Sequence, residues 1–386
     1  MRRAKLATPF GVGCLVLLLG VRETRPQDTR TAAPGAEGRF PQNAKLASLP
    51  ENVWEKVSGP APAPAGILAY SGGIFDTASH KFLIFGGGHA DYWGNEVCAF
   101  DPATLSWRKM YEPDAQARYT SSNIDNQNGK LRDSDRPYTR HSYNQLCFIP
   151  GTGMFLFGGC GPGWGSIAPS CPVPPDVWAY STHENRWTEL YSGPGTPGGY
   201  AMSCCFDTRR KKVWAYGHDS QLSGFDLSAK TWTRVPLKPD VGYLGGYNFH
   251  MEYLPKIDRI LIVGQDTCTV DPETFRTERH PFEHSSGKGG LAYLPDQDAV
   301  FHALLTVGGL YRAAVFDCAR RTWRDWETQN LPAGAKGKGT EAEGGEGNVW
   351  SRLQYDPVDK VLLLVVADGV WALKPPPKFE EAALKR

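Results

Sequence analysis

The fold of this chain is decided by two segments, Lys81-Phe-Leu-Ile-Phe-Gly-Gly-Gly88 and Glu96-Val-Cys-Ala-Phe-Asp-Pro-Ala-Thr-Leu-Ser-Trp107. An apolar strand ends in glycines, and an aromatic strand, an Asp-Pro turn and a tryptophan follow. The same order of features returns twice, in Met154–Gly159 with Asp176–Trp187 and in Lys212–Gly217 with Ser223–Trp232. A repeat of about 40–50 residues indicates an architecture of stacked, similar units.

Further copies of the repeat are weaker. They are Arg259–Gly264 with Cys268–Phe275, Val307–Gly309 with Ala314–Trp323, and Arg352–Leu373. The last copy has no final tryptophan strand. Near the other end of the chain, Asn52–Val57 carries a tryptophan and has no preceding partner strand. We therefore expect this N-terminal strand to complete the last unit.

Each copy predicts four antiparallel strands, because its runs are short, rich in Val, Phe, Tyr and Trp, and bounded by Gly, Pro, Asp and Asn. One such unit cannot bury both of its faces, so the units are expected to close a ring around an axis. We predict an all-β fold, a six-bladed β-propeller whose last blade is closed by an N-terminal strand. The predicted blades are residues 66–110, 137–190, 198–235, 241–279, 285–326, and 347–374 joined by 52–57. The alternative of two β-sandwiches is disfavoured by the regular spacing of the tryptophans.

In its Gly-Gly pairs, Tyr/Phe-Asp turns and following tryptophans, the chain resembles the kelch-repeat β-propellers, including the propeller of galactose oxidase. The resemblance covers roughly residues 52–374. It implies a fold rather than a function, since propellers serve as enzymes, lectins and scaffolds. Galactose oxidase needs a copper site with an adjacent Tyr-His pair, and no Tyr-His dipeptide occurs in this sequence. That difference disfavours a copper radical oxidase.

Composition and the chain ends narrow the cellular role. The 386 residues carry a formal net charge of +1, which offers no global attraction to nucleic acid or an anionic membrane. Basic residues precede a short apolar run near Phe10–Val21, so residues 1–24 are predicted to be a signal peptide or anchor of a secreted or periplasmic protein. We predict no membrane contact beyond it. Residues 25–50 are predicted to be a disordered linker, 51–377 the propeller, and 378–386 a C-terminal tail.

The cysteines suggest one disulfide and otherwise buried packing. Cys160 and Cys171 bracket a Gly/Pro-rich loop, and export permits disulfides, so we predict that they pair. Four other cysteines are expected to pack in the core as small buried apolar side chains: Cys98, Cys147, Cys268 and Cys318. No Cys-x-x-Cys pair argues for zinc.

The loop after the second strand of each blade and the connection between blades emerge on the same face. The most distinctive segment on this face is Gly86–Asn95, whose three consecutive glycines allow a tight turn. It carries His89, Asp91, Tyr92 and Trp93 within five residues. The structural alternative is that His89 and Asp91 pair and rigidify the loop. Loops of the neighbouring blades are expected to add Trp164 and His218 to this face.

A second segment, Arg136–Tyr143, begins a blade. In the functional interpretation Arg140 holds an anion near the axis; in the structural one it braces the inner strand, as such residues do in kelch repeats. Candidate acids and bases from the inter-blade connections are His141, Tyr143, Tyr200 and Tyr243. The preceding insertion, residues 112–136, is a lid or a solvated loop.

The leading functional hypothesis is a secreted propeller that binds a polysaccharide or cell-envelope glycan on this face. Its catalytic form is a polysaccharide lyase acting on uronate-containing glycans by β-elimination, with Arg140 neutralising the carboxylate. His89 or His141 would act as base. The acid would be Tyr143, Tyr200 or Tyr243, and the substrate-binding residues Asp91, Tyr92, Trp93, Trp164 and His218.

Two alternatives stay open at this point. One is a non-catalytic interaction propeller that binds an exported protein in the cell envelope. The other is a hydrolase or metal enzyme that uses His89, Asp91 and His218, although spacing across blades cannot establish a metal site. No cofactor is predicted, and a structural metal ion is left open.

Overall fold

The computed structural model confirms the all-β fold and the six-bladed β-propeller. The residues that it describes are 39–87, 92–161, 173–199, 201–217, 219–241, 244, 249–282, 289–305, 311–332 and 349–379. Within them, six four-stranded antiparallel sheets form the blades, and one two-stranded sheet lies outside the blades. None of the helices in these ranges has the length and apolarity that a membrane span requires.

The first three blades follow the three strongest copies of the repeat. Blade 1 consists of β2 (Gly72–Asp76), β3 (Lys81–Phe85), β4 (Val97–Asp101) and β5 (Ser106–Lys109). Blade 2 consists of β8 (Leu146–Ile149), β9 (Gly153–Phe157), β10 (Asp176–Ser181) and β11 (Arg186–Ser192). Blade 3 consists of β12 (Ser203–Asp207), β13 (Lys212–Tyr216), β14 (Leu222–Asp226) and β15 (Thr231–Val235).

The weaker copies form the other three blades. Blade 4 consists of β16 (His250–Leu254), β17 (Arg259–Val263), β18 (Thr267–Val270) and β19 (Thr277–Arg279). Blade 5 consists of β20 (Gly290–Leu294), β21 (Ala299–Leu305), β22 (Tyr311–Asp317) and β23 (Thr322–Trp326). Blade 6 consists of β24 (Leu353–Asp356), β25 (Val361–Val366), β26 (Gly369–Leu373) and the N-terminal β1 (Trp54–Ser58).

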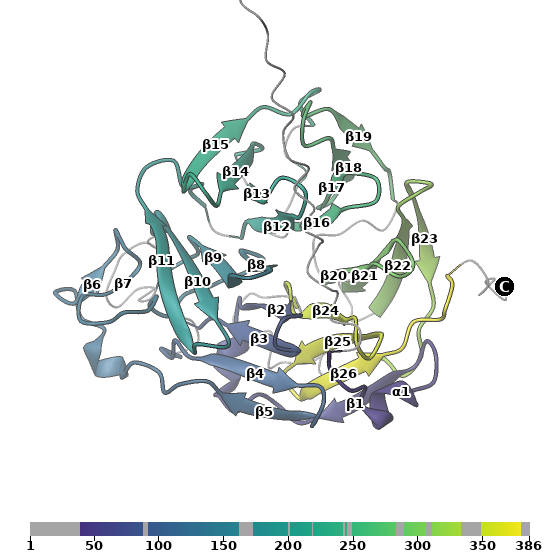
Figure 1. Cartoon of the computed structure of the whole chain (residues 1–386), viewed down its shortest axis with the longest axis horizontal. Coiled ribbons are helices and arrows are strands. Elements are labelled where there is room, and N and C mark those ends of the chain that lie inside the picture. Colours follow the sequence, from purple (N-terminus) through teal and green to yellow (C-terminus); the bar gives the residue numbers. More distant parts are fainter. Residues whose placement is uncertain are drawn as a thin grey trace, which may run out of the picture. The chain divides into compact units, whose positions relative to one another are not determined.

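The blades close into a ring. Their inner strands β2, β8, β12, β16, β20 and β24 contact one another in this order, and β24 also contacts β2 (Figure 1). Strand β1 pairs antiparallel with β26, with Trp54 opposite Leu373. This confirms that an N-terminal strand completes the last blade, which leaves the ring without a free blade edge at its seam.

The repeated tryptophan packs on the aromatic residue of the neighbouring strand. Trp107 lies opposite Phe100 in the strand register, and their ring centroids are 5.4 Å apart. The other copies of this pair are Trp187 with Tyr180 at 5.2 Å, Trp232 with Phe225 at 5.1 Å, and Trp323 with Phe316 at 5.1 Å. Cross-strand aromatic pairs of this kind stabilise the outer edge of a sheet. This contact explains why a tryptophan follows the aromatic strand in copy after copy of the repeat.

The hydrophobic core lies between blades. Phe82 and Ile84 of blade 1, for example, share a buried cluster with Leu363 and Val365 of blade 6. Similar clusters of described residues occupy the other interfaces around the ring. The cysteines predicted to be buried apolar residues are buried and free: Cys98, Cys147, Cys268 and Cys318. The predicted Cys160–Cys171 pair stays a prediction, because Cys171 lies outside the described residues.

The predicted linker is wrong for its last part, residues 39–50. Asn43 caps α1 (Ala44–Ala47) by accepting hydrogen bonds from backbone N–H groups of the first turn. Leu46 and Leu49 are buried in the cluster between blades 6 and 1. Burial of these two leucines compensates for ordering the segment, so composition alone misjudged it.

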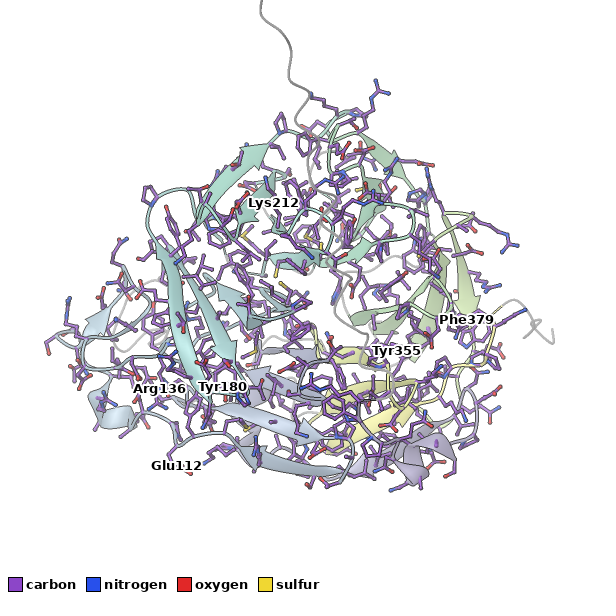
Figure 2. The ribbon with its side chains drawn as sticks, in the orientation of Figure 1. Glu112, Arg136, Tyr180, Lys212, Tyr355 and Phe379 are labelled. Carbon is purple, nitrogen blue, oxygen red and sulfur yellow. The ribbon has the colours of Figure 1, made fainter. Side chains whose placement is uncertain are left out.

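The insertion at residues 112–136 packs at the rim. It contains η2 (Gln116–Arg118) and the hairpin of β6 (Ile124–Asp125) and β7 (Lys130–Leu131) beside the outermost strand β11 (Figure 1). Ser192 of β11 donates a 2.8 Å hydrogen bond to the Gln127 carbonyl. Arg136 donates one of 3.1 Å to the Glu112 carbonyl; both residues are labelled in Figure 2. The interpretation as a lid over the axis is therefore wrong.

Two short elements complete the described chain. The one-turn helix η1 (Ala65–Leu68) leads into blade 1. After blade 6, Phe379 packs edge-on against Trp326 of β23, with ring centroids 4.6 Å apart (Figure 2). The start of the predicted C-terminal tail is thus anchored on blade 5.

Candidate binding site at the axial mouth

Four residues that lead into inner strands share an unusual backbone conformation. Tyr70, Tyr143, Ala201 and Trp350 have φ values between +47° and +57°, in a left-handed region that residues with a side chain rarely adopt. They precede β2, β8, β12 and β24 by a few residues. Together with His141 these residues form a cluster at one end of the inner strands, which we call the axial mouth.

Three aromatic rings from three blades meet at the axial mouth. Tyr143 and Trp350 pack edge to face, with centroids 4.9 Å apart. Tyr70 contacts Tyr143 at 5.8 Å and Trp350 at 6.1 Å. Tyr143 and Trp350 are buried, whereas Tyr70 is half-buried and so keeps part of its ring exposed.

His141 joins this group through both its ring and its backbone. Its imidazole stacks on Tyr70 at 4.7 Å with an interplanar angle of 21°. Its Nδ1 and the hydroxyl of Tyr143 share a hydrogen bond of 3.0 Å. Its backbone N–H donates to the Cys160 carbonyl at 2.9 Å. The structure therefore brings together two predicted site residues, His141 and Tyr143.

Arg140 points into the protein and braces it. The guanidinium is 0% exposed, forms a 2.9 Å ion pair with Asp176 and donates to the Gly158 carbonyl at 2.8 Å. It also donates to the Gly129 carbonyl of the insertion. A substrate carboxylate would have to displace these partners, so the position of Arg140 does not support its predicted role in holding an anion. It fits the bracing interpretation that the sequence left open.

Tyr92 and Trp93 lie apart from the axial mouth contacts. The Tyr92 hydroxyl donates to the carboxylate of Glu96, and burial is the main cause that raises the pKa of Tyr92. Trp93 packs against Tyr119 of the insertion at 5.4 Å. Both side chains are half-buried. The Trp93 contact holds the insertion against blade 1, whereas the Tyr92 contact lies within the blade 1 loop.

The other predicted site residues lie outside the described residues: His89, Asp91, Trp164, Tyr200, His218 and Tyr243. Their assignments stay predictions. His250 is buried in β16 and packs near His302, with ring centroids 5.9 Å apart.

A cavity of about 360 Å³ runs along the inner strands, and its lining includes Asn144 and Ser351, which directly follow Tyr143 and Trp350 of the axial mouth in the chain. At the mouth end its lining residues are Asn144, Ser203 and Ser351. Further along, the lining includes Cys147, Cys204, Cys205, Glu252 and Gln354. The described lining of this channel contains no lysine or arginine, so the channel offers hydrogen-bonding groups without a fixed positive charge.

Glu252 changes the electrostatics of the channel. Burial raises the pKa of its carboxyl to about 8, so the group is mostly protonated at neutral pH and can donate a hydrogen bond. Burial also raises the pKa of the Cys204 and Cys205 thiols, which keeps them uncharged and poorly nucleophilic. The channel is thus close to neutral and suits an uncharged polar group.

The comparisons with known proteins add no family. A search against protein-family models and a search of curated proteins each found no match.

Sequence reasoning missed Tyr70, Trp350 and Glu252. A signal for the first two was present: in Tyr70-Ser71, Tyr143-Asn144 and Trp350-Ser351 an aromatic residue precedes a small polar residue just before an inner strand. Glu252 gave no such signal, because only closure of the ring buries its carboxyl.

Proposed function

We propose that this propeller binds carbohydrate and takes a neutral sugar unit of a glycan at its axial mouth. The observation that carries the proposal is the cluster of Tyr70, His141, Tyr143 and Trp350, which three blades hold together. Of these four, Tyr70, Tyr143 and Trp350 have left-handed backbone conformations. Such strain persists where the surrounding structure over-determines it, and it gathers at ligand sites.

The chemistry of the mouth suits a sugar. Aromatic rings offer flat apolar faces with polar tips, and binding sites combine such rings with a few convergent polar groups. Tyr70 supplies a partly exposed ring, and the His141–Tyr143 pair supplies hydrogen-bonding groups. The uncharged channel favours hydroxyl-rich neutral units over uronates, since no described cation lines it.

The substitution Tyr70→Asn tests the site. Asparagine tolerates the left-handed backbone of Tyr70 and removes the ring. Losing one stacking ring costs about 1 kcal/mol, so we expect roughly fivefold weaker binding in affinity electrophoresis with neutral polysaccharides. The matched control is Tyr191→Thr, which removes a half-buried tyrosine from the outer strand β11. If wild-type protein is retarded by none of a panel of neutral and uronate polysaccharides, the proposal is wrong.

The lyase is the second candidate, favoured by the His141–Tyr143 hydrogen bond. In this form one member of the pair removes the proton α to the uronate carboxylate, and a protonated group donates to the leaving oxygen. No arginine or lysine is among the described residues that line the channel, which makes simple binding the better supported form. An ultraviolet absorbance rise with a uronate polysaccharide, absent in Tyr143→Phe, would establish the lyase instead.

Three further assignments belong to this proposal. The kelch-type relationship is supported by the packing of the repeated tryptophans, and a secreted or periplasmic location by the N-terminal pattern of residues 1–24. An exported protein as partner is the alternative to a glycan, because the propeller fold is consistent with either role. Retention on a bait protein without retention on any glycan would favour that alternative.

A further inference from the structure

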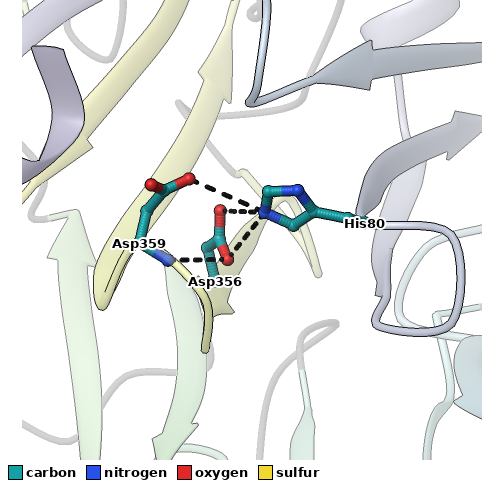
Figure 3. Close-up of side chains that lie close together, drawn as sticks. All are labelled: His80, Asp356 and Asp359. Atoms are coloured by element: carbon teal, nitrogen blue, oxygen red, sulfur yellow. Dashed lines mark hydrogen bonds and ion pairs between the residues drawn. The ribbon is translucent and has the colours of Figure 1, made fainter. Parts of the chain in front are cut away.

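A second cluster of chemically reactive side chains lies at the turns between inner and second strands, where blades 1 and 6 meet. His80 ends the turn between β2 and β3. Asp356 ends β24, and Asp359 lies in the turn between β24 and β25 (Figure 3). One ligand atom from each residue lies within 4.8 Å of the others. None of the three belongs to the axial mouth.

The cluster is buried. His80, Asp356 and Asp359 are 1%, 0% and 2% exposed. Two carboxylates face one imidazole, and His80 is the basic side chain in ion-pair contact with them among the described residues. Buried charges of one sign are costly unless they are paired or coordinate a metal.

One carboxylate oxygen of the cluster accepts no hydrogen bond. Asp356 accepts from the backbone N–H groups of Val358 and Asp359 and from His80. Asp359 Oδ1 accepts from the Asn43 N–H at 2.6 Å. Asp359 Oδ2, in contrast, is buried without a hydrogen-bond partner and points toward His80 Nε2 at 3.6 Å (Figure 3). A buried oxygen left in this state points to a cation.

The spacing of the ligand atoms fits a small metal ion. His80 Nε2 lies 2.9 Å from Asp356 Oδ2 and 3.6 Å from Asp359 Oδ2. Ligand atoms of a tetrahedral Zn²⁺ site lie about 3.4 Å from one another. Asp356 Oδ1, 3.1 Å from the same nitrogen, can supply a further oxygen.

We propose that His80, Asp356 and Asp359 bind one divalent first-row cation of the Zn²⁺ type, which joins blade 1 to blade 6 and so locks the ring. An imidazole and carboxylates are typical Zn²⁺ ligands. Ca²⁺ requires six to eight oxygens, which this enclosed set does not provide. The proposal is independent of the glycan proposal.

The segment before α1 offers an access path. Phe40 is half-buried and stacks on the His80 ring, with centroids 5.2 Å apart. Phe40 and Arg39 also line a surface pocket of about 490 Å³ beside the cluster. Displacement of this short segment would open the cluster to solvent, and its return would bury the ion.

The test uses the full chain, stripped with a chelator and titrated with Zn²⁺ alone. We expect one equivalent to bind and the Tm to rise by about 5 °C when Zn²⁺ is in large excess over its dissociation constant. In Asp359→Asn and His80→Asn we expect binding weakened more than about 100-fold, beyond the loss typical of outer-shell partners. Asparagine keeps an acceptor at Asp359 and tolerates the left-handed φ of His80.

The control is Asp135→Asn, an exposed aspartate of the insertion, and this variant should bind Zn²⁺ as the wild type does. Stoichiometric binding that both cluster variants retain would overturn the proposal, as would a wild type whose Tm does not respond to Zn²⁺. Should a variant fail to fold, Co²⁺ replaces Zn²⁺ in the wild type. A tetrahedral visible spectrum supports the site, and its absence contradicts it.

Discussion

Arg140 shows how one side chain can look functional in the sequence and act structurally in the fold. It lies beside His141 in the segment Arg136–Tyr143, yet it is fully buried and paired with Asp176. Trp178 donates a 2.8 Å hydrogen bond to the same carboxylate. Burial nevertheless raises the pKa of Asp176. Each buried charge of this ion pair is therefore stabilised only while its partner is present.

The substitution Arg140→Met should destabilise the protein by about 3–5 kcal/mol, because it leaves the Asp176 carboxylate buried and uncompensated. Arg186→Met, at an exposed ion pair with Glu184, should cost less than about 1 kcal/mol. Urea unfolding of both variants measures the difference. A stable Arg140→Met protein that has lost glycan binding would instead assign Arg140 to the site.

Strand β1 is the element on which ring closure depends. It carries Trp54, which is 0% exposed and packs in the cluster between blades 5 and 6. The sequence repeat predicted this strand, because the last copy lacks an outer strand and β1 has no partner of its own.

The substitution Trp54→Ala should cost about 3–5 kcal/mol, as expected for a large aromatic side chain removed from a core. Trp107→Ala is the matched control, since Trp107 is half-buried on the outermost strand of blade 1. Thermal and urea unfolding compare the two. Equal losses would mean that β1 has no special role in closing the ring.

The axial channel exists only when six inner strands face one another. Glu252 lies on β16, yet its carboxyl accepts a hydrogen bond from the backbone of Tyr293 in the next blade. That hydrogen bond by itself lowers the pKa of the carboxyl, and burial outweighs it and raises the pKa.

Stability should fall as pH rises from about 4.5 to about 8, because in this window folded Glu252 holds a proton that the unfolded chain has released. We expect a fall on the order of 2 kcal/mol, with part of the pKa effect screened by solvent that reaches the half-buried group. Glu252→Gln should remove this part of the slope in urea unfolding series at several pH values. Exposed Glu184→Gln is the control, and an unchanged slope in Glu252→Gln would contradict the assignment.

Much of the fold could be predicted because its information is local. The Phe/Tyr-Asp turn and the following tryptophan form contacts within one hairpin, as in Phe100 with Trp107, so each copy specifies its own blade. The candidate site was predicted in part: His141 and Tyr143 are two residues apart and meet directly. Their neighbours Tyr70 and Trp350 come from blades distant in sequence, and nothing local links them.

The repeat alone was therefore sufficient for the blades, their strand order and the N-terminal strand that closes the ring, since each of these follows from short-range pairing and the need to bury two sheet faces. Folding in three dimensions determined the rest. It turned Arg140 inward to Asp176, buried Glu252 in the axial channel, and placed His80 against Asp356, 276 residues later in the chain. These contacts cross between distant parts of the chain, so their energies arise only when the ring has closed.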